Sequence, residues 1–369
     1  MCQFVCSCQL HFRLIAASNS RICPAKIVSF ETSKPACTMR RLPVFLLAVV
    51  GSPLCAQTRG TATTLEAIRQ TTRPDTIAVI DLTTDDVANN GWQEIPQEIA
   101  RCRNAKKLFV PGHGLTGIPK WLSRMDSLAV LDLSGNPLRV RAVRFRRNRH
   151  IKTINFSGCG FKESPGKLRK NKRLEQLVFN ENSFAKFPKA LCRIKTLREL
   201  NFYRNQLSEL PRQLEKLTSL RVMDLYYNRF KEFPMVVCKI RSQETLAFSY
   251  NQLEQIPDEI NQLTKLKEIY LRGNRLTSLP ETLRKMPAVR KMYLSDNAFT
   301  YVPEMIFGMP GLEELDVSGN RIERFPADIA QMAKLKTLFM GDNPYAYPNH
   351  REYVKFVESI KSQGVEVFD

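Results

Sequence analysis

The stretch that decides the fold is residues 266–283, which read LKEIYLRGNRLTSLPETL. The same pattern recurs with a step of 23 residues, from the copy that begins at Ala105 to the copy that begins at Leu335. An earlier copy begins at Ile77 and carries five extra residues near 88–92, which makes twelve copies. A fixed period of this length is typical of a solenoid, in which each unit packs only against its neighbours.

Each position of the repeat, counted from the first residue of a copy, has a physical reason. Positions four and six are apolar and alternate with variable residues, which predicts a short strand with one buried face. Stacked copies then form a parallel sheet with strands ~4.8 Å apart. Position nine is Asn in nine of the twelve copies, where a side-chain amide can satisfy buried backbone groups. Position fifteen is Pro in ten of the first eleven copies, which predicts an extended return along the convex side.

The repeat reads LxxLxLxxNxLxxLPxxLxxLxx, and on these residues the chain resembles leucine-rich-repeat proteins. The resemblance is to the 23-residue type with a Leu-Pro pair, familiar from Ras-suppressor-like and many bacterial repeat proteins. It covers residues 77–343. The resemblance implies an α/β solenoid: a curved horseshoe with a concave parallel sheet, and a convex side of extended, 3-10 and short helical segments. It also implies a role in protein recognition, without implying a particular ligand.

Some copies depart from the repeat. Asp85, His113 and Cys159 occupy position nine, where we expect each to make a structural hydrogen bond. The copy at 128–150 has Arg141 and Ala142 in place of the Leu-Pro pair, so its convex segment should be irregular.

The residues from Met39 to Gln57 have the layout of a secretory signal. Arg40 and Arg41 precede a short apolar run, and Ala56 suits cleavage before Gln57. The apolar run is too short to span a bilayer, which needs about 20 residues. Because a signal begins a chain, the simplest interpretation is that residues 1–38 are a mis-called extension. The alternative is a metal-binding module built from its cysteines, although their spacing matches no zinc pattern.

The ends of the repeats need caps that cover the core. At the N-terminal end we expect a short helix over residues 63–72. At the C-terminal end, the apolar residues of 351–363 have helical spacing, and residues 365–368 can add an edge strand to the sheet. The predicted organisation is a mis-called extension (1–38), a signal peptide (39–56), an N-terminal cap (57–76), twelve leucine-rich repeats (77–343) and a C-terminal cap (344–369).

The sequence contains no recognised catalytic motif: no phosphate-binding loop, dinucleotide fingerprint, HExxH, GxSxG or kinase signature. We therefore expect no enzyme activity, no cofactor and no metal site. Cys192 and Cys238 share position nineteen two copies apart, roughly 10 Å by stacking geometry. That separation is too large for a disulfide, so buried free thiols are expected.

The tyrosines gather on one predicted face. Positions three, five, seven and eight should face the concave side, and six of the ten tyrosines fall there across five adjacent copies. Tyrosine and arginine among adaptable polar groups are typical of protein interfaces. The alternative is an aromatic ladder that only packs along the sheet. The predicted partner-binding residues are Tyr203, Arg204, Asp224, Tyr226, Tyr227, Tyr250, Tyr270, Arg272 and Tyr293.

The formal net charge is +20, and its excess is concentrated in the convex halves of the third and fourth copies. Such a patch favours an anionic polymer or a membrane surface, although it can also be a solvated face. Its residues include Arg144, Arg146, Arg147, Arg149, Arg169 and Lys170.

The function that these patterns predict is an exported, non-enzymatic protein that binds a protein or peptide through its tyrosine-rich concave face. Export would place it in a secreted, periplasmic or cell-surface location. Two alternatives stay open. One is a binder of anionic glycan, lipid or nucleic acid through the arginine-rich patch, and the other is an intracellular signalling scaffold, for which the signal would have to be false.

Overall fold

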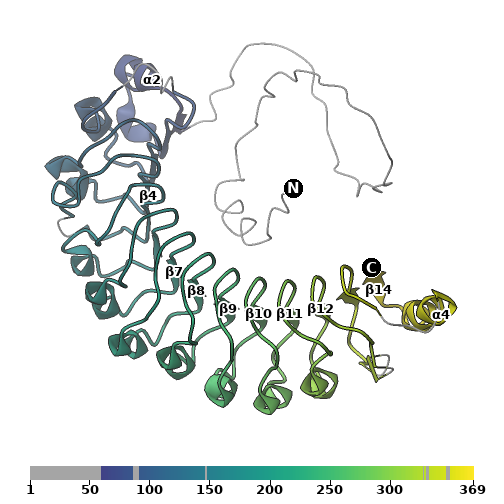
Figure 1. The fold of residues 1–369 in the computed structure, drawn as a ribbon. Coiled ribbons are helices and arrows are strands. Elements are labelled where there is room, and N and C mark those ends of the chain that lie inside the picture. The colour runs from purple at the N-terminus through teal and green to yellow at the C-terminus, as the bar shows by residue number, and fades with distance from the viewer. Residues whose placement is uncertain (1–59, 86–90, 146–147, 327, 330–331, 346–349) are drawn as a thin grey trace, which may run out of the picture. The chain divides into compact units, whose positions relative to one another are not determined.

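The structure, a computed structural model, describes residues 60–85, 91–145, 148–326, 328–329, 332–345 and 350–369. They contain one 14-stranded sheet in which every pair of neighbours is parallel and the strand order follows the chain. In the repeat array the strands lie on the inner side of the curve (Figure 1). The strands are β1 (Thr61–Ala62), β2 (Val79–Asp81), β3 (Lys107–Phe109), β4 (Val130–Asp132), β5 (Thr153–Asn155), β6 (Gln176–Val178), β7 (Glu199–Asn201), β8 (Val222–Asp224), β9 (Thr245–Ala247), β10 (Glu268–Tyr270), β11 (Lys291–Tyr293), β12 (Glu314–Asp316), β13 (Thr337–Phe339) and β14 (Glu366–Phe368).

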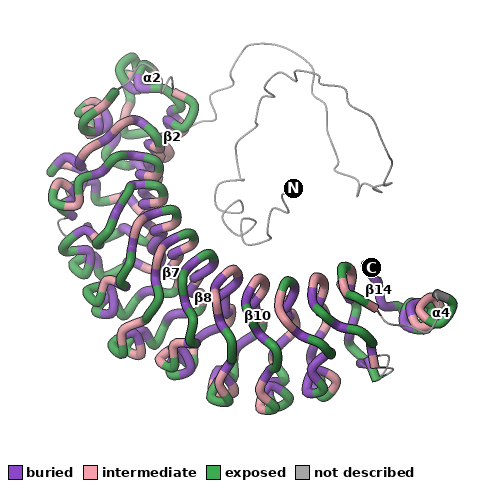
Figure 2. Tube along the Cα trace, in the orientation of Figure 1, coloured by how far each residue is buried: buried purple, intermediate pink, exposed green. Residues whose placement is uncertain are grey.

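The core follows from positions four and six of the repeat. These side chains, such as Leu200 and Phe202 of the copy that holds β7, are fully buried in each copy, as alternation predicted. Figure 2 shows that buried residues recur along the inner, strand side of copy after copy. Phenylalanine at position six stacks from copy to copy, with 5.4 Å between the ring centroids of Phe156 and Phe179 and 5.3 Å between Phe179 and Phe202. The predicted solenoid with one continuous core is confirmed.

The asparagines at position nine form the predicted ladder. Asn251 Nδ2 donates to the carbonyl of Phe248 in its own copy and to that of Leu225 in the copy before. Its Oδ1 accepts the backbone N–H of Phe230 at 3.1 Å. Each amide therefore satisfies buried backbone groups of two copies at once, where an unpaired group would be costly.

The three substitutes at position nine each make a hydrogen bond, as expected. Asp85 accepts the backbone N–H of Leu65, and the Cys159 thiol lies 3.3 Å from the carbonyl oxygen of Leu133. His113 Nδ1 lies 2.7 Å from the carbonyl oxygen of Pro111.

The convex side has the extended and 3-10 segments that the resemblance implied, with an extended proline in front of most of the 3-10 helices. In most copies the proline is the residue before a 3-10 helix, and its carbonyl oxygen accepts the first hydrogen bond of that helix. For example, the backbone N–H of Leu214 donates to the carbonyl of Pro211. Its fixed φ near −65° suits this position, and it needs no N–H of its own there. These helices are Gln97–Arg101, Lys120–Arg124, Lys189–Arg193, Arg212–Lys216, Met235–Lys239, Asp258–Gln262, Glu281–Lys285 and Glu304–Gly308. A shorter one, Leu168–Lys170, begins after Lys167 instead, and another, Pro74–Thr76, precedes β2.

The copy at 128–150 is irregular, as the loss of its Leu-Pro pair predicted. Among its described residues no 3-10 helix follows β4, and the backbone bonds between Arg139 and Arg144 form successive turns. Val143 and Phe145 are buried and keep this segment on the core.

Both ends of the array carry additional elements. Helix α2 (Leu65–Gln70) is capped by Thr64 Oγ1, which accepts the N–H of Ala67, and β1 pairs with β2. Helix α4 (His350–Lys361) is followed by β14, which extends the sheet beyond β13. Within the described residues no helix is long and apolar enough to cross a membrane. The segments 1–38 and 39–56 lie outside the described residues.

Candidate functional site: a tyrosine ladder on the inner face of the sheet

The turn that ends each strand forces position eight into a left-handed conformation. From the second copy to the twelfth every residue there has a positive φ, and in five copies it is glycine. Glycine adopts this conformation without a steric penalty, whereas other residues incur a cost of roughly 1–2 kcal/mol. Tyr227 and Tyr250 occupy the position with φ of 53° and 51°. Bulky aromatic residues are uncommon there, and strain that a protein keeps often marks a functional site.

Six tyrosines, which we call the tyrosine ladder, form two stacks because the 23-residue step places equivalent side chains on neighbouring strands. In the second stack Tyr270 and Tyr293 lie 4.7 Å apart, nearly parallel. The first stack includes the Tyr227–Tyr250 pair, with centroids 4.5 Å apart and planes 17° apart. These separations match the strand spacing. The first stack is Tyr203, Tyr226, Tyr227 and Tyr250.

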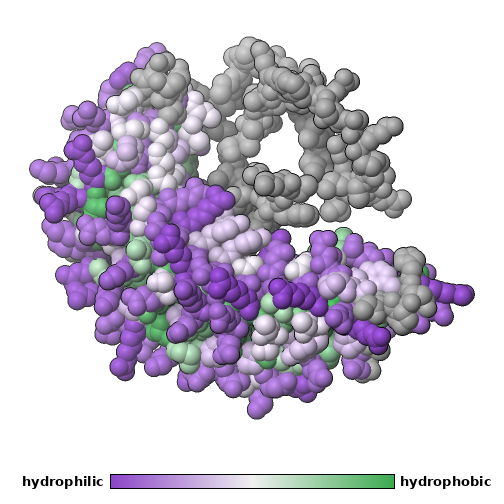
Figure 3. Space-filling model, in the orientation of Figure 1, coloured by the Kyte–Doolittle hydropathy of each residue, from purple (hydrophilic) through white to green (hydrophobic). Residues whose placement is uncertain are grey.

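The tyrosines differ in exposure, which corrects the expectation that all six face outward. Tyr226 is 5% exposed because three other rings of the ladder pack around it. Tyr270 is 9% exposed because Tyr293 stacks on it. Tyr227 is 38% exposed, and Tyr203, Tyr250 and Tyr293 are half-buried. Figure 3 shows a pale, moderately polar area on the inner side of the array, flanked by strongly hydrophilic surface.

Two arginines flank the first stack. Arg204 lies over the rings of Tyr203 and Tyr227, with its guanidinium carbon 5.3 and 5.4 Å from their centroids. Arg272 lies over Tyr250 at 5.5 Å. Cations over aromatic faces are attracted by the ring quadrupole. The predicted arginines are therefore in place beside the rings.

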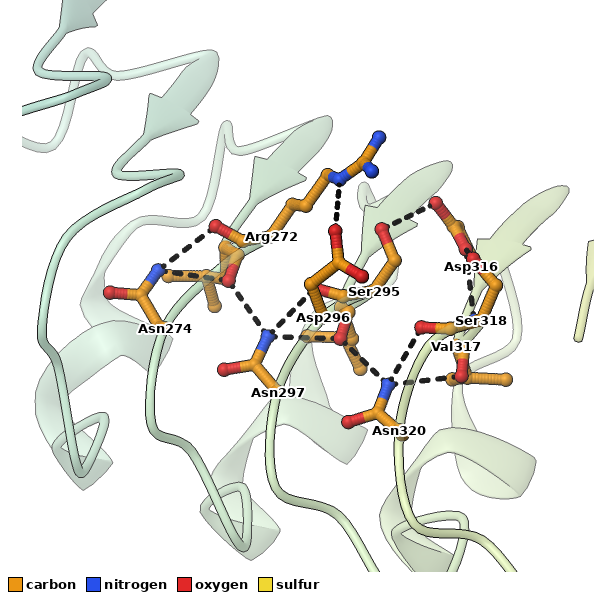
Figure 4. A network of polar contacts seen from close by, with 11 residues as sticks. Arg272, Asn274, Ser295, Asp296, Asn297, Asp316, Val317, Ser318 and Asn320 are labelled. Atoms are coloured by element: carbon orange, nitrogen blue, oxygen red, sulfur yellow. Dashed lines mark hydrogen bonds and ion pairs between the residues drawn. The ribbon is translucent and has the colours of Figure 1, made fainter. Parts of the chain in front are cut away.

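Each arginine is held by a carboxylate. Arg272 Nε donates to Asp296 Oδ2 at 2.8 Å (Figure 4), and the Arg204 guanidinium lies 3.7 Å from Glu181. Both carboxylates are at position eight, so the stack is closed by an ion pair on each side.

Gly273 makes room for Tyr250. A Cβ atom at Gly273 would lie 2.7 Å from a ring carbon of Tyr250, so only glycine lets the ring pack flat against the next turn. The first stack ends at this glycine. The sequence signal for this packing is the change from Tyr to Gly at position eight between neighbouring copies.

The hydroxyls separate the two stacks. In the second stack Tyr293 donates to Glu314 at 2.6 Å and Tyr270 donates to Glu268 at 3.3 Å. In the first stack the hydroxyls of Tyr203 and Tyr227 make no hydrogen bond with any other described residue. The hydroxyls of the second stack are therefore satisfied within the array.

Three phenols of the ladder, those of Tyr203, Tyr250 and Tyr293, are held in the protonated form at neutral pH because their pKa is raised. Burial raises the pKa of Tyr203 and of Tyr250 above the usual range. Burial and the hydrogen bond to Glu314 raise the pKa of Tyr293 further. These three side chains are therefore neutral rings with hydroxyl groups rather than phenolate nucleophiles.

Asp224, which sequence analysis grouped with the partner-binding residues, shapes the turn. Its Oδ1 accepts the backbone N–H of Tyr226 at 3.0 Å. Asp132 and Asp316 act alike: each accepts the backbone N–H and the hydroxyl of a serine two residues later, as Figure 4 shows for Asp316 and Ser318. This is a local turn motif that needs no partner.

A charge pattern at position two was missed from the sequence. Three cation–carboxylate–cation triads cross the sheet, each made by residues 23 apart. The sequence does indicate them, because position two of three successive copies reads cation, carboxylate, cation in each triad. The triads are Lys152–Glu175–Arg198, Arg221–Glu244–Lys267 and Arg290–Glu313–Lys336.

Of the six cations that the sequence predicted for the convex patch, four are described and all four are exposed. The other two, Arg146 and Arg147, lie outside the described residues. Arg144 and Arg149 belong to one copy, and Arg169 and Lys170 belong to the next. A separate cavity of 680 Å³ is lined by residues of the last copies, among them Arg284, Tyr301 and Phe325, and by no ladder residue.

The cysteines of the repeats are free and buried, as expected for Cys192 and Cys238. Burial raises the pKa of Cys192 to about 11 and that of Cys238 to about 12, so neither is a ready nucleophile. No group of three potential metal ligands is found among the described residues.

Comparison with known proteins agrees with the geometry. Family models described as leucine-rich repeat match residues 243–299 and 311–332. No curated protein sequence matches the chain.

Solved structures share the fold. A leucine-rich-repeat protein of Leptospira interrogans is 23% identical with a TM-score of 0.61, covering 80% of this chain and 79% of that one. A chain of the octameric complex of Latrophilin 3, Unc5D and the FLRT2 leucine-rich repeats is 22% identical with a TM-score of 0.62, covering 76% and 88%. An internalin of Listeria monocytogenes is 16% identical with a TM-score of 0.54, covering 74% and 82%. With its asparagine ladder and its 23-residue step, this chain is a leucine-rich-repeat protein.

Proposed function

We propose that this protein binds a protein or peptide partner through the first stack of the tyrosine ladder, without catalysing a reaction. The observation that carries the proposal is that Tyr227 and Tyr250 occupy a left-handed turn position that five other copies fill with glycine. A glycine would fit without strain, so the rings are retained against a local cost. Tyrosine and arginine are enriched among interface residues that dominate binding energy.

The surface of the first stack fits such a role. The Tyr227 ring is exposed, and the Tyr203 and Tyr227 hydroxyls are free for hydrogen bonds to a partner's backbone. Arg204 and Arg272 stand on either side, each oriented by a carboxylate. Preorganised rings and cations lose little conformational freedom on binding, which favours affinity. One structure of the same fold comes from a multiprotein complex, which agrees with this class of function.

The test is binding by the Tyr227→Gly and Tyr250→Gly variants. Glycine removes the ring and the strain together, so the fold is kept while the contact is lost. With a partner identified by capture on the wild-type chain, we expect each variant to bind at least tenfold more weakly, since an aromatic hot spot contributes about 2 kcal/mol or more. Tyr301→Ala is the matched control, because Tyr301 is 52% exposed and stands outside the ladder. Equal affinity of wild type and both glycine variants would refute this site.

Export is the second part of the proposal. It rests on the signal layout of residues 39–56, which precedes the first described residues of the array. N-terminal sequencing of the native protein should begin at or near Gln57. Recovery of intact Met1 or Met39 would instead favour the intracellular scaffold.

A further inference from the structure

We infer a second binding site on the convex side, the basic patch, which takes a linear anionic polysaccharide. The basic patch consists of the described cations of segments 139–149 and 162–173, all of them exposed. The only carboxylate in the two segments is Glu163. These segments lie on the outer side of the array between β4 and β7 (Figure 1), away from the tyrosine ladder.

Like charges repeat at equivalent positions of the two copies. Three pairs, which we call rungs, stand 23 residues apart at positions twelve, seventeen and twenty-two. Residues at one position of adjacent copies are neighbours in a stacked solenoid, and the regular register is kept at Arg139, which bonds Thr116, and next to Arg149, where Asn148 bonds Asn171. The rungs at positions twelve and twenty-two therefore each place two cations side by side and repel internally. The rungs are Arg139 with Lys162, Arg144 with Lys167, and Arg149 with Lys172.

The rung cations differ from the cations at position two, which are paired with carboxylates of neighbouring copies. At position two, by contrast, Glu175, Glu244 and Glu313 each stand between two cations and pair with both of them. No rung residue has an ion pair among the described residues. The chain can therefore neutralise repeated cations along its stack and does not do so here. An external polyanion would supply the missing charge.

The chemistry of the basic patch restricts the class of ligand that it can bind. The aromatic residues of this region, Phe145, Phe156 and Phe161, are buried, so no stacking platform for single-stranded nucleic acid is present among its described residues. No large hydrophobic side chain of the two segments is exposed, so nothing there inserts into a bilayer.

The place of the basic patch on the convex side restricts the class of ligand further. A convex surface meets a flat membrane over only a small area, whereas a flexible chain follows it. The adjoining segment 186–195 adds four exposed cations and no carboxylate, which extends the path for such a chain. The choice of polysaccharide over duplex nucleic acid rests on the proposed export.

The test is affinity of the mature chain for heparin, measured against salt, with duplex DNA and phosphatidylserine vesicles as comparison ligands. We expect heparin binding that weakens steeply with salt, because counterions are released on contact. The triple variant Arg139→Glu, Lys162→Glu, Lys172→Glu should bind heparin at least tenfold more weakly. These three side chains make no hydrogen bond or ion pair with other described residues, so the fold should be kept.

The matched control changes net charge by the same amount elsewhere, with Lys231→Glu, Arg241→Glu and Lys285→Glu. These exposed cations also have no ion pair among the described residues. The control should keep at least half of the heparin affinity. Equal losses in the two triple variants would show that only net charge matters and would overturn the site. Tighter binding of duplex DNA or of vesicles than of heparin would overturn the ligand class, whereas the export proposal is decided separately by N-terminal sequencing.

Discussion

At the scale of single residues, the array tolerates a polar group in the core. Gln243 occupies position one, where neighbouring copies have Leu220 and Leu266, and it is fully buried. Its Nε2 and Oε1 have no hydrogen-bond partner among the described residues. An unsatisfied buried amide costs about 1–3 kcal/mol, so Gln243→Leu should raise the free energy of unfolding by that amount.

Chemical denaturation of wild type and variant measures this change. The reciprocal substitution Leu220→Gln, one copy earlier, should lower the free energy of unfolding instead. A Gln243→Leu protein that is less stable than wild type would mean that the amide has a structural role.

The residue scale also shows what sequence could not predict. The position-nine asparagines were assigned correctly, because the same side chain recurs where buried backbone needs partners. The left-handed φ of Tyr227 and Tyr250 was missed, since the residues themselves disfavour it. Only the glycines at the same position of other copies, such as Gly273, carried that signal.

At the scale of strands and turns, the position-two triads make stability depend on pH. The hydrogen bond and charge of Lys267 hold the pKa of Glu244 below its usual range, and Lys336 does the same for Glu313. A carboxylate whose pKa is lowered by folding stabilises the folded state above its unfolded pKa, about 4.3. That contribution is lost as the pH falls through the folded pKa.

The variant Glu244→Gln tests this contribution. It should be slightly less stable than wild type at pH 7, because partly exposed pairs contribute little. The difference in unfolding free energy between the two proteins should vanish as the pH falls below about 4. Glu232→Gln is the control, because Glu232 is exposed with no ion pair among the described residues. A difference that is constant from pH 7 to pH 3 would contradict the ion-pair explanation.

The same scale explains the error about exposure. Alternation correctly assigned Tyr226 and Tyr270 to the inner face. It could not show that neighbouring rings cover them, because that depends on contacts between residues 23 or 24 apart. The irregular copy at 128–150 was predictable, since the missing Leu-Pro pair removes the residue that begins a 3-10 helix.

At the scale of the whole array, period and core were predictable because every copy repeats the same physical solution. The function was harder to predict from the sequence, because the repeat determines only the scaffold, whereas the ligand depends on the variable positions. Two surfaces stand out: the first tyrosine stack, with its left-handed Tyr227 and Tyr250, and the basic patch, whose rung cations have no ion pair among the described residues.

The central claim is that the Tyr227 ring is retained for a partner and not for the fold. The measurement that tests it most directly is the free energy of unfolding of Tyr227→Gly beside Tyr227→Ala. Glycine relieves roughly 1–2 kcal/mol of left-handed strain. Tyr227 contacts three neighbouring rings. At the lower end of the usual range, about 0.5 kcal/mol per ring pair, the stacking lost is about 1.5 kcal/mol, which this relief offsets. We predict that Tyr227→Gly lies within about 1 kcal/mol of wild type and about 1 kcal/mol above Tyr227→Ala, which loses the ring but keeps the strain. A Tyr227→Gly protein that is less stable than wild type by about 3 kcal/mol or more would show that the ring holds the solenoid together, and would contradict the claim.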